Sequence, residues 1–478
     1  MMDYYPPNFL KDLKKIHLTG IKGVGMTALA LCLVDAGCEV SGSDVSDEFV
    51  TDEVLRKRNI SWKIGFSPSN VDDDINALVF TAAHGGLKNP EVISAKNRGI
   101  PVFSYAQFMA NLANTKDVIG VCGVGGKSTT SAMIANLFDY AHLKPSYIVG
   151  VGGIFPLGFP GHYEKDGKFF VCESDEYAVS PGVDNRPKFY LINHKILVVT
   201  NIEYDHPDIY HSFAETKKAF RLAFEKLPRD GLLVACVNNS NVASLLDNLK
   251  CKVITYGFSE NADFRIQNYY LDSQKALCRI INGRIKYEFK LSVPGRFNAL
   301  NALASFIVGK HVGINVDDII LGLESYLGCR RRFEIVKTQN GITYVDDYAH
   351  HPKEILNTIH AAREWFSGRR IIVLFQPHTY SRTKALFDDF SFALSKSDVV
   401  GLVDIFSSAR EEKDDSVNSK LLVDKIKTMN KNSFYIGGVS EIDAWLDKNV
   451  MRNDVVITMG AGDIYKYHYA QPSKKYKK

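Results

Sequence analysis

The sequence has 478 residues, a length typical of about three domains. Its 45% hydrophobic and 23% charged residues are ordinary for a globular protein. The net charge of +4, from 58 basic and 54 acidic residues, argues against a nucleic-acid or membrane surface. The eight cysteines form no C-x-x-C pair, and no apolar run approaches the roughly 18 residues of a membrane span. We therefore expect a cytoplasmic protein that binds neither nucleic acid nor membrane, with the basic run Lys474–Lys478 as a solvated tail.

The N-terminal part has the pattern of alternating strands and helices. Lys15–Thr19 is a predicted strand, the glycine-rich stretch Gly20–Met26 follows, and a helix comes next. A second strand ends in Ser43 and Asp44, where a ribose-binding acid would stand in a dinucleotide fold. The spacing is G-x-x-G-x-G rather than G-x-G-x-x-G. It therefore predicts either a nucleotide-type ligand or only a tight turn between strand and helix. A further strand is expected at Ala77–Thr81 and another at Pro101–Phe103.

A second glycine-rich turn lies between the apolar run Val118–Val121 and the helical pattern Ser131–Phe138. Such a turn at a helix N-terminus presents backbone N–H groups and partial positive charge to an anion. Within it, Lys127 can neutralise the β- and γ-phosphates and Ser128 can ligate Mg²⁺. Val121 stands where the full phosphate-loop pattern has a glycine, which leaves the shorter G-x-x-G-K-S. We predict a phosphate-binding loop, the alternative being a glycine-rich turn with an incidental lysine.

Two buried strands of the middle region run into polar residues. The strand Lys168–Cys172 leads into Glu173–Glu176, and Ile196–Thr200 leads into a loop that contains His206. Ligands bind at the carboxyl ends of strands in open α/β sheets, and buried acids need a cation or a donor. Glu173 is predicted as a magnesium ligand and His206 as a ligand of a second metal or of phosphate; surface loops are the alternative. The segment from Lys252 to Val293 is predicted to form antiparallel strands.

In the C-terminal part, polar residues again follow the ends of predicted strands. Strands at Ile342–Val345 and Arg370–Phe375 lead into Asp346–Pro352 and Gln376–Thr383. Three arginines, Arg330–Arg332, precede them and either clamp phosphate or are solvated. We therefore predict an α/β protein of three domains. These are a Rossmann-like domain over residues 1–116, a central phosphate-loop ATPase-like domain over 117–328 and a Rossmann-like domain over 329–478.

An ordered set of motifs resembles the Mur ligase family of peptidoglycan synthesis, and its alanine-adding members in particular. The resemblance covers essentially the whole chain. The matching blocks are Gly20–Met26 with Ser43–Asp44, Asn89–Glu91, Gly123–Thr130, Glu173, Thr200–His206, Asp346–Pro352 and Phe375–Thr383.

Three residues and one segment depart from the family pattern. Val124 stands where the family has Thr, Gly125 where it has His or Asn, and Phe297 where His is usual. The segment Gly182–Phe189 is an insertion relative to ordinary alanine-adding members, and it resembles the relative that recycles murein tripeptide. The Phe375–Thr383 block favours the addition of alanine over the ligation of murein tripeptide.

The resemblance implies an ATP-dependent ligase that joins L-alanine to UDP-N-acetylmuramate through an acyl phosphate, with Mg²⁺ or Mn²⁺. Its catalytic residues are expected to be Lys127, Glu173, His206, His350 and Arg382. ATP would contact Gly123, Val124, Gly125, Gly126, Lys127, Ser128, Thr129, Asn298, Asn301, Arg331 and Asp346. The other substrates would contact Gly20, Gly23, Gly25, Met26, Ser43, Asp44, Tyr348, His350, His378 and Arg382, and the metal would take Ser128, Glu173 and His206.

Other functions stay open at this point. Because of the insertion, a ligase of murein tripeptide is one alternative. Because of the altered glycine-rich loop, a protein that binds nucleotide without turnover is another. A nicotinamide-dependent oxidoreductase would account for the first glycine turn but not for Lys127, Glu173 and His206. We expect a monomer or a weak homodimer.

Overall fold

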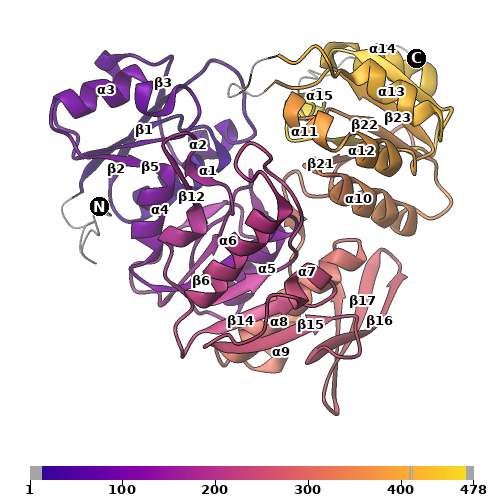
Figure 1. The fold of residues 1–478 in the computed structure, drawn as a ribbon, viewed down its shortest axis with the longest axis horizontal. Helices are drawn as coiled ribbons and strands as arrows, with labels where there is room; N and C mark the ends of the chain where they lie inside the picture. The colour runs from indigo at the N-terminus through magenta and orange to yellow at the C-terminus, as the bar shows by residue number, and fades with distance from the viewer. Residues whose placement is uncertain (1–12, 408–410, 412, 470–478) are drawn as a thin grey trace. The chain divides into compact units, whose positions relative to one another are not determined.

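The computed structural model describes residues 13–407, 411 and 413–469, so the basic tail lies outside the described residues. These residues build three large sheets flanked by helices, with two further sheets of two strands each, which confirms the predicted α/β class (Figure 1). The chain divides into two compact units. The first holds the N-terminal sheet and most of the central sheet, and the second holds the C-terminal sheet with the short segments Leu271–Ala276 and Val293–Phe297. Within the described ranges, no helix combines the length and apolar character that a bilayer crossing needs.

The N-terminal sheet has five parallel strands in the order β3-β2-β1-β4-β5. The order reverses direction between β1 and β4, and ligands bind at such switch points in open parallel sheets. Buried apolar side chains occupy most of α1, which explains why its sequence is apolar nearly all round. The elements are β1 (Lys15–Thr19), α1 (Val24–Asp35), β2 (Glu39–Asp44), α2 (Asp52–Lys57), β3 (Trp62–Ile64), β4 (Ala77–Phe80), α3 (Pro90–Asn97), β5 (Val102–Ser104) and α4 (Tyr105–Ala113).

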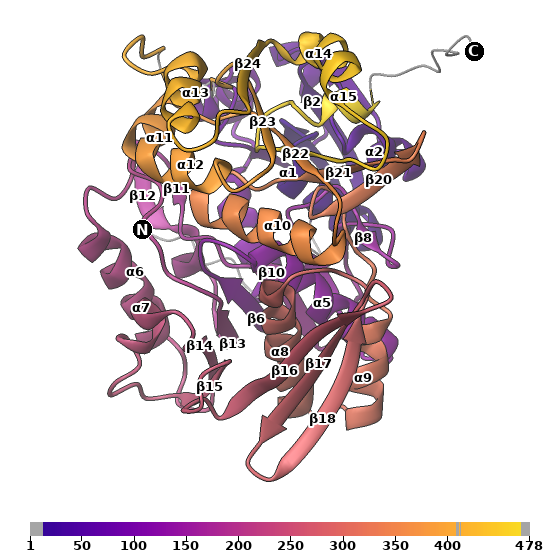
Figure 2. The same ribbon diagram turned by 90° about the vertical axis from the view of Figure 1, so that its right-hand side faces the viewer.

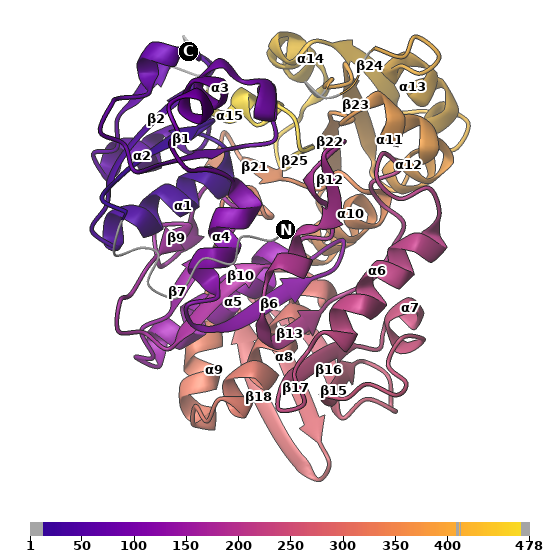
Figure 3. The same ribbon diagram turned by 60° about the vertical axis from the view of Figure 1, so that its left-hand side comes forward.

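The central sheet has ten strands in the order β18-β17-β16-β15-β14-β13-β6-β10-β7-β9. Strand β6 lies between β13 and β10 and is parallel to both, so the loops after these three strands meet at one edge. Helix α5 packs on β6 and β10, as Figure 3 shows. The elements up to β14 are β6 (Asp117–Cys122), α5 (Lys127–Tyr140), β7 (Ser146–Ile148), β8 (Ile154–Phe155), β9 (Gly161–His162), β10 (Phe169–Glu173), β11 (Ala178–Ser180), β12 (Asp184–Pro187), β13 (His194–Val199), α6 (Phe213–Glu225) and β14 (Leu232–Cys236).

The far half of this sheet corrects one prediction. Strand β15 is parallel to β14 and to β16, so the antiparallel direction predicted from Lys252 onward is wrong for this strand. Alternation of apolar and polar residues reports one exposed face and not strand direction. Helix α9 packs on β18, and both are visible in Figure 2. The remaining elements are α7 (Ser240–Ala243), β15 (Lys252–Gly257), β16 (Phe264–Asp272), β17 (Lys275–Asn282), β18 (Ile285–Leu291), α8 (Arg296–His311) and α9 (Val316–Glu324).

The first two sheets share one unit because contacts between them are extensive. A hydrophobic cluster runs from Ile16 and Leu18 of β1 to Phe170 and Cys172 of β10. Asp35 at the end of α1 bonds His162 Nδ1 at 2.6 Å in β9. The predicted division into three domains is not tested by this packing and stays a prediction.

The C-terminal sheet has six strands in the order β20-β21-β25-β22-β23-β24, and only the β20–β21 pair is antiparallel among its paired strands. Helices α10, α12 and α13 pack side by side. The elements are β19 (Gly328–Cys329), β20 (Glu334–Gln339), β21 (Ile342–Asp347), α10 (Pro352–Trp365), β22 (Ile371–Phe375), α11 (Tyr380–Ala385), α12 (Phe387–Leu394), β23 (Val399–Val403), α13 (Ser419–Lys427), β24 (Ser433–Gly437), α14 (Ile442–Asn449), β25 (Val455–Met459) and α15 (Lys466–Tyr469).

Candidate active site

The glycine-rich loop joins β6 to α5, as the sequence predicts. Gly123 has φ 125° and Gly126 has φ 86°, both in the region that favours glycine. A Cβ on Gly123 would lie 2.3 Å from Thr200 Oγ1, and one on Gly126 would lie 2.8 Å from Asn301 Oδ1. Side chains are thus excluded at both positions, and the backbone leads directly into the first turn of α5. This is the arrangement that binds phosphate at a helix N-terminus.

Two side chains after β13 hold the loop in place. Asn201 forms a pair of bonds with the backbone of Gly125, accepting from its N–H at 3.0 Å and donating to its carbonyl at 2.8 Å. The Thr200 hydroxyl donates to the same carbonyl at 2.6 Å. The loop is therefore fixed through its backbone, and residue 125 needs no side chain to keep its place. Val124 and Thr129 complete the loop residues that the sequence predicts for ATP.

Lys127 begins α5 and points to the loop and to two carboxylates. Its ammonium donates to the Gly123 carbonyl at 2.6 Å and to both oxygens of Glu176, at 3.1 and 3.0 Å. Asp175 Oδ1 lies 3.7 Å away. Burial alone would lower the pKa of Lys127, but the carboxylates of Glu176, Asp175 and Glu173 outweigh it and raise the pKa above its usual range. The lysine therefore stays charged, as a phosphate-binding cation must.

Asp175, Glu176 and His206 form a compact cluster, with one ligand atom of each within 4.8 Å of the others. Burial would lower the pKa of His206, but neighbouring carboxylates, with Asp205 the foremost, raise it. Burial would raise the pKa of Asp175, but Lys188, Lys127 and His206 hold it well below its usual range. Two carboxylates and an imidazole fit a hard divalent cation such as Mg²⁺ or Mn²⁺.

Of the predicted ligands, Glu173 lies two residues before Asp175 in the chain, and Ser128 directly follows Lys127. Ser128 is 3% exposed in the first turn of α5, and Glu173 ends β10 beside Val121 of β6. Glu173 Oε1 accepts from the Gly150 N–H at 2.6 Å. Sequence reasoning selected Glu173 alone and missed Asp175 and Glu176 as partners of His206. The signal was present, because Asp175 and Glu176 come directly after the buried strand that Glu173 ends.

The residues predicted at the adenine side lie near the loop. Asn298 and Asn301 occupy the start of α8, each 4% exposed, and Asn301 Nδ2 donates to Asn298 Oδ1 at 3.1 Å. The close approach of Asn301 to Gly126 brings this helix to the phosphate loop.

The first glycine turn is closely packed at the carboxyl end of β1. Gly20 has φ 82°, and a Cβ on Gly25 would lie 2.9 Å from the Tyr105 ring. Gly23 precedes α1, and Met26 is buried in the core of the unit. Asp44 is 1% exposed, and its Oδ2 accepts from the backbone N–H of Lys22 at 2.7 Å. The predicted acid thus supports the turn in this structure.

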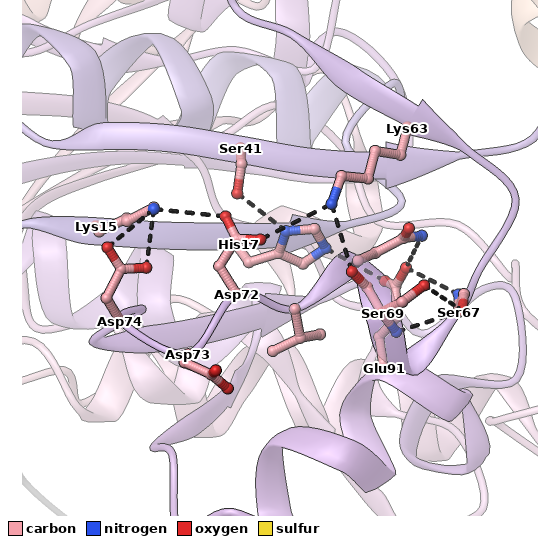
Figure 4. Close-up of polar contacts among 12 residues, drawn as sticks. Lys15, His17, Ser41, Lys63, Ser67, Ser69, Asp72, Asp73, Asp74 and Glu91 are labelled. Carbon is pink, nitrogen blue, oxygen red and sulfur yellow. Dashed lines mark hydrogen bonds and ion pairs between the residues drawn. The ribbon is translucent and has the colours of Figure 1, made fainter.

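A buried carboxylate lies behind this turn. Glu91 is fully buried near the start of α3, and Figure 4 shows it beside His17 and Ser67. Burial alone would raise the pKa of Glu91, but hydrogen bonds from side chains outweigh it and lower the pKa to about 2. The donors to its two oxygens are His17 Nε2 (3.4 Å), Thr19 Oγ1 (2.7 Å), Ser43 Oγ (2.6 Å), Ser67 N (3.3 Å) and Asn70 Nδ2 (2.7 Å). The hydroxyl of Ser43, a residue predicted to contact substrate, donates its hydrogen bond to Glu91 in this structure.

In the second unit, the residues predicted for the amino-acid pocket lie together. His350 Nδ1 is 3.0 Å from the Tyr348 carbonyl oxygen, and the His350 and His378 rings are 6.5 Å apart. Arg382 donates from its guanidinium to His378 Nδ1 at 3.3 Å. Arg382 is 7% exposed, so a carboxylate that reached it would meet a poorly hydrated cation.

Arg331 and Asp346, both predicted for ATP, form a buried pair in the same unit. Arg331 Nε donates to Asp346 Oδ2 at 3.1 Å, and the guanidinium lies between the rings of Tyr348 and Tyr465. The alternative of a solvated arginine is therefore wrong for Arg331. The adjacent Asp347 has its pKa raised to about 6, chiefly by burial.

Comparison with family models matches three successive segments. The model described as the Mur ligase family catalytic domain matches residues 15–117. The Mur ligase middle domain matches residues 121–309, and the Mur ligase glutamate ligase domain matches residues 331–462.

Individual relatives match along nearly the whole chain. A UDP-N-acetylmuramate–L-alanine ligase from Desulfitobacterium hafniense is 36% identical over 458 residues, covering 94% of this chain and 98% of that one. The crystal structure of a UDP-N-acetylmuramate–alanine ligase from Thermotoga maritima has a TM-score of 0.78 at 28% identity, covering 95% and 97%. A murein peptide ligase from Psychrobacter arcticus has a TM-score of 0.71 at 20% identity, covering 96% and 98%, which shows likeness of fold alone.

Proposed function

Because this chain belongs to the Mur ligase family, we propose that it joins L-alanine to UDP-N-acetylmuramate with hydrolysis of ATP, a step of peptidoglycan precursor synthesis. The observation that carries the proposal is the placement of Lys127. It lies at the start of a helix that follows a glycine loop, directly against the carboxylates that follow β10. A cation, loop N–H groups and acidic metal ligands are the parts that phosphoryl transfer requires.

The chemistry follows from the poor reactivity of a carboxylate. The carboxylate of the muramate attacks the γ-phosphate, and the amine of L-alanine then displaces phosphate from the acyl phosphate. Lys127 and the N–H groups of the loop would bind the phosphates and stabilise the charge that develops on them. One divalent cation would be held by Ser128 and Glu173, and a second by His206 together with Asp175 and Glu176. Bound cations would supply charge neutralisation at the transferred phosphoryl group.

The substrates are assigned to separate elements. We propose that Gly20, Gly23, Gly25 and Asp44 hold the UDP-sugar, with Ser43 and Met26 behind them. Asn298, Asn301, Arg331 and Asp346 are proposed for the nucleoside side of ATP. His350, His378, Tyr348 and Arg382 are proposed for L-alanine, with the guanidinium on the amino-acid carboxylate.

The same proposal includes the domain bounds, the metal, the location and the oligomeric state. We propose domains over residues 1–116, 117–328 and 329–478, the use of Mg²⁺ or Mn²⁺, a cytoplasmic location and a monomer or weak homodimer. The cysteines, all free and buried, support a reducing compartment.

The deciding experiment measures ADP release by the purified full-length chain with UDP-N-acetylmuramate. L-alanine, L-serine, glycine and murein tripeptide are offered separately and then in competition, and products are separated by mass. The L-alanine adduct is expected to dominate. A dominant tripeptide adduct would point to the recycling reaction. Nucleotide binding without any adduct would point to a binder that does not turn over.

A further inference from the structure

A hairpin separates the acidic cluster from the next strand of the central sheet. Strand β11 pairs with β12 in antiparallel register, Ala178 opposite Pro187 and Ser180 opposite Asp184. The chain leaves the acids Asp175 and Glu176, runs through the hairpin and returns at Lys188. The hairpin falls largely within the segment 182–189 that the sequence marks as an insertion.

Two backbone hydrogen bonds fix the base of this hairpin. The Lys188 N–H donates to the Tyr177 carbonyl at 3.0 Å, and the Phe189 N–H donates to the Asp175 carbonyl at 3.2 Å. The Cα atoms of Lys188 and Asp175 are therefore held close together whatever their side chains do. The backbone of Lys188 is therefore fixed beside the acidic cluster.

The side chain of Lys188 turns toward the cluster. Its ammonium donates to Asp175 Oδ2 at 2.8 Å and lies 5.4 Å from the centre of the Tyr177 ring. The other oxygen of Asp175 lies 3.7 Å from the Lys127 ammonium. Asp175 thus lies between two ammonium groups, and that of Lys127 also donates to the Gly123 carbonyl of the glycine-rich loop.

We propose that Lys188 is a positioning residue that sets the divalent-cation affinity of the Asp175, Glu176 and His206 cluster, an inference that rests on the proposed function. A fixed positive charge beside Asp175 opposes the approach of a dication and occupies one of its oxygens. Lys127 can move its charge to bound phosphate, whereas Lys188 is tied to the hairpin and keeps its place. Its effect therefore acts with or without nucleotide, and it keeps the cluster from retaining a metal ion too tightly.

The test is Mn²⁺ binding to the full-length protein without nucleotide, followed by electron paramagnetic resonance of the free ion. Lys188→Met should bind Mn²⁺ about fivefold more tightly, since an ion-pair contribution of this kind is modest at a partly exposed site. Lys188→Arg keeps the positive charge and should therefore bind Mn²⁺ with the wild-type affinity. The matched control is Lys195→Met, because Lys195 forms an ion pair of 2.6 Å with Asp230 and lies at the start of β13, whereas His206 comes after the end of that strand.

A double-mutant comparison separates charge from structure. Asp175→Asn should weaken Mn²⁺ binding, and Lys188→Met should have little effect in that background because its partner is gone. This comparison also covers the case in which Lys188→Met alone folds poorly. A purely structural role would shift the thermal midpoint and leave the Mn²⁺ affinity unchanged.

Equal or weaker Mn²⁺ binding by Lys188→Met would overturn the proposal, as would a failure of Lys188→Arg to restore it. Adduct formation by the wild-type protein is measured on the same preparation. If no L-alanine adduct forms, the proposed function fails on that measurement, while the Mn²⁺ titrations still decide the role of Lys188.

Discussion

Replacing Glu91 by glutamine should destabilise the N-terminal part of the protein strongly at neutral pH. The glutamate accepts hydrogen bonds on both oxygens, and the amide of Glu91→Gln would turn an N–H₂ group toward donors. The folded pKa of about 2, against 4.5 for the free side chain, corresponds to roughly 3 kcal/mol at neutral pH. Donors left without an acceptor add to this, so we expect a loss of at least about 3 kcal/mol.

The sign of the pH dependence follows from the lowered pKa. A group whose folded pKa lies below its unfolded value stabilises the protein fully above the unfolded pKa, and this contribution is lost as the pH falls toward the folded pKa. For Glu91 the window runs from about pH 4.5 down to about pH 2. The glutamine variant has no such group. The difference in unfolding free energy between wild type and Glu91→Gln should therefore become smaller by roughly 0.8 kcal/mol when the pH falls from 6 to 4.

Urea denaturation measures both effects. Trp62 packs against the hydrophobic cluster of the first sheet and can report on this region once Trp365 and Trp445 are replaced by phenylalanine. The matched control is Glu53→Gln, an exposed glutamate on α2 that pairs with Lys57 and should change stability little. Equal midpoints for Glu91→Gln and wild type would refute the reasoning, and so would a gap that is the same at pH 6 and pH 4.

Three further changes test the proposed site. Lys127→Ala should lower the rate of ADP release at least a hundredfold, because charge stabilisation at the transferred phosphate typically contributes about 3 kcal/mol; a variant with more than half of the wild-type rate would contradict the phosphate loop. Glu173→Gln keeps an oxygen for the Gly150 N–H, so the fold should persist while the Mg²⁺ concentration for half activity rises; superimposable metal titrations would remove Glu173 from the ligands. Arg382→Ala should raise the KM for L-alanine roughly ten- to a hundredfold with little change for ATP, whereas Arg363→Ala, which breaks an exposed pair with Asp398, should leave it unchanged. A similar loss for both arginine variants would argue against a pocket at Arg382.

The features that the sequence predicted well are those encoded locally. An apolar strand, a glycine turn and a helix follow one another within Val118–Phe138, so their positions depend on neighbouring residues alone. Polar residues after Val199 and Val345 were correctly placed at strand ends for the same reason. Parallel strands then bring such ends together, which is why loop and acids could be assigned to one edge.

Features that depend on distant partners could not be predicted in this way. The donors of Glu91 come from three separate segments of the chain, and the spacing of Asn89–Glu91 does not predict them. The direction of β15 is likewise fixed by its neighbours β14 and β16. Lys188 contacts Asp175 because the β11–β12 hairpin returns the chain to it, and the sequence indicates an insertion but does not predict the course of its backbone.

The altered phosphate loop shows how a local departure is absorbed by a distant contact. The family pattern that the sequence resembles would place His or Asn at position 125, and this chain has glycine there. Asn201 bonds both the N–H and the carbonyl of Gly125, and Thr200 bonds that carbonyl as well, so the loop is fixed without help from its own side chains. These two residues belong to the block that also supplies His206. The loop after β13 therefore holds the glycine-rich loop and also carries the proposed metal ligand, so we expect a change at Asn201 to disturb phosphate and metal binding together.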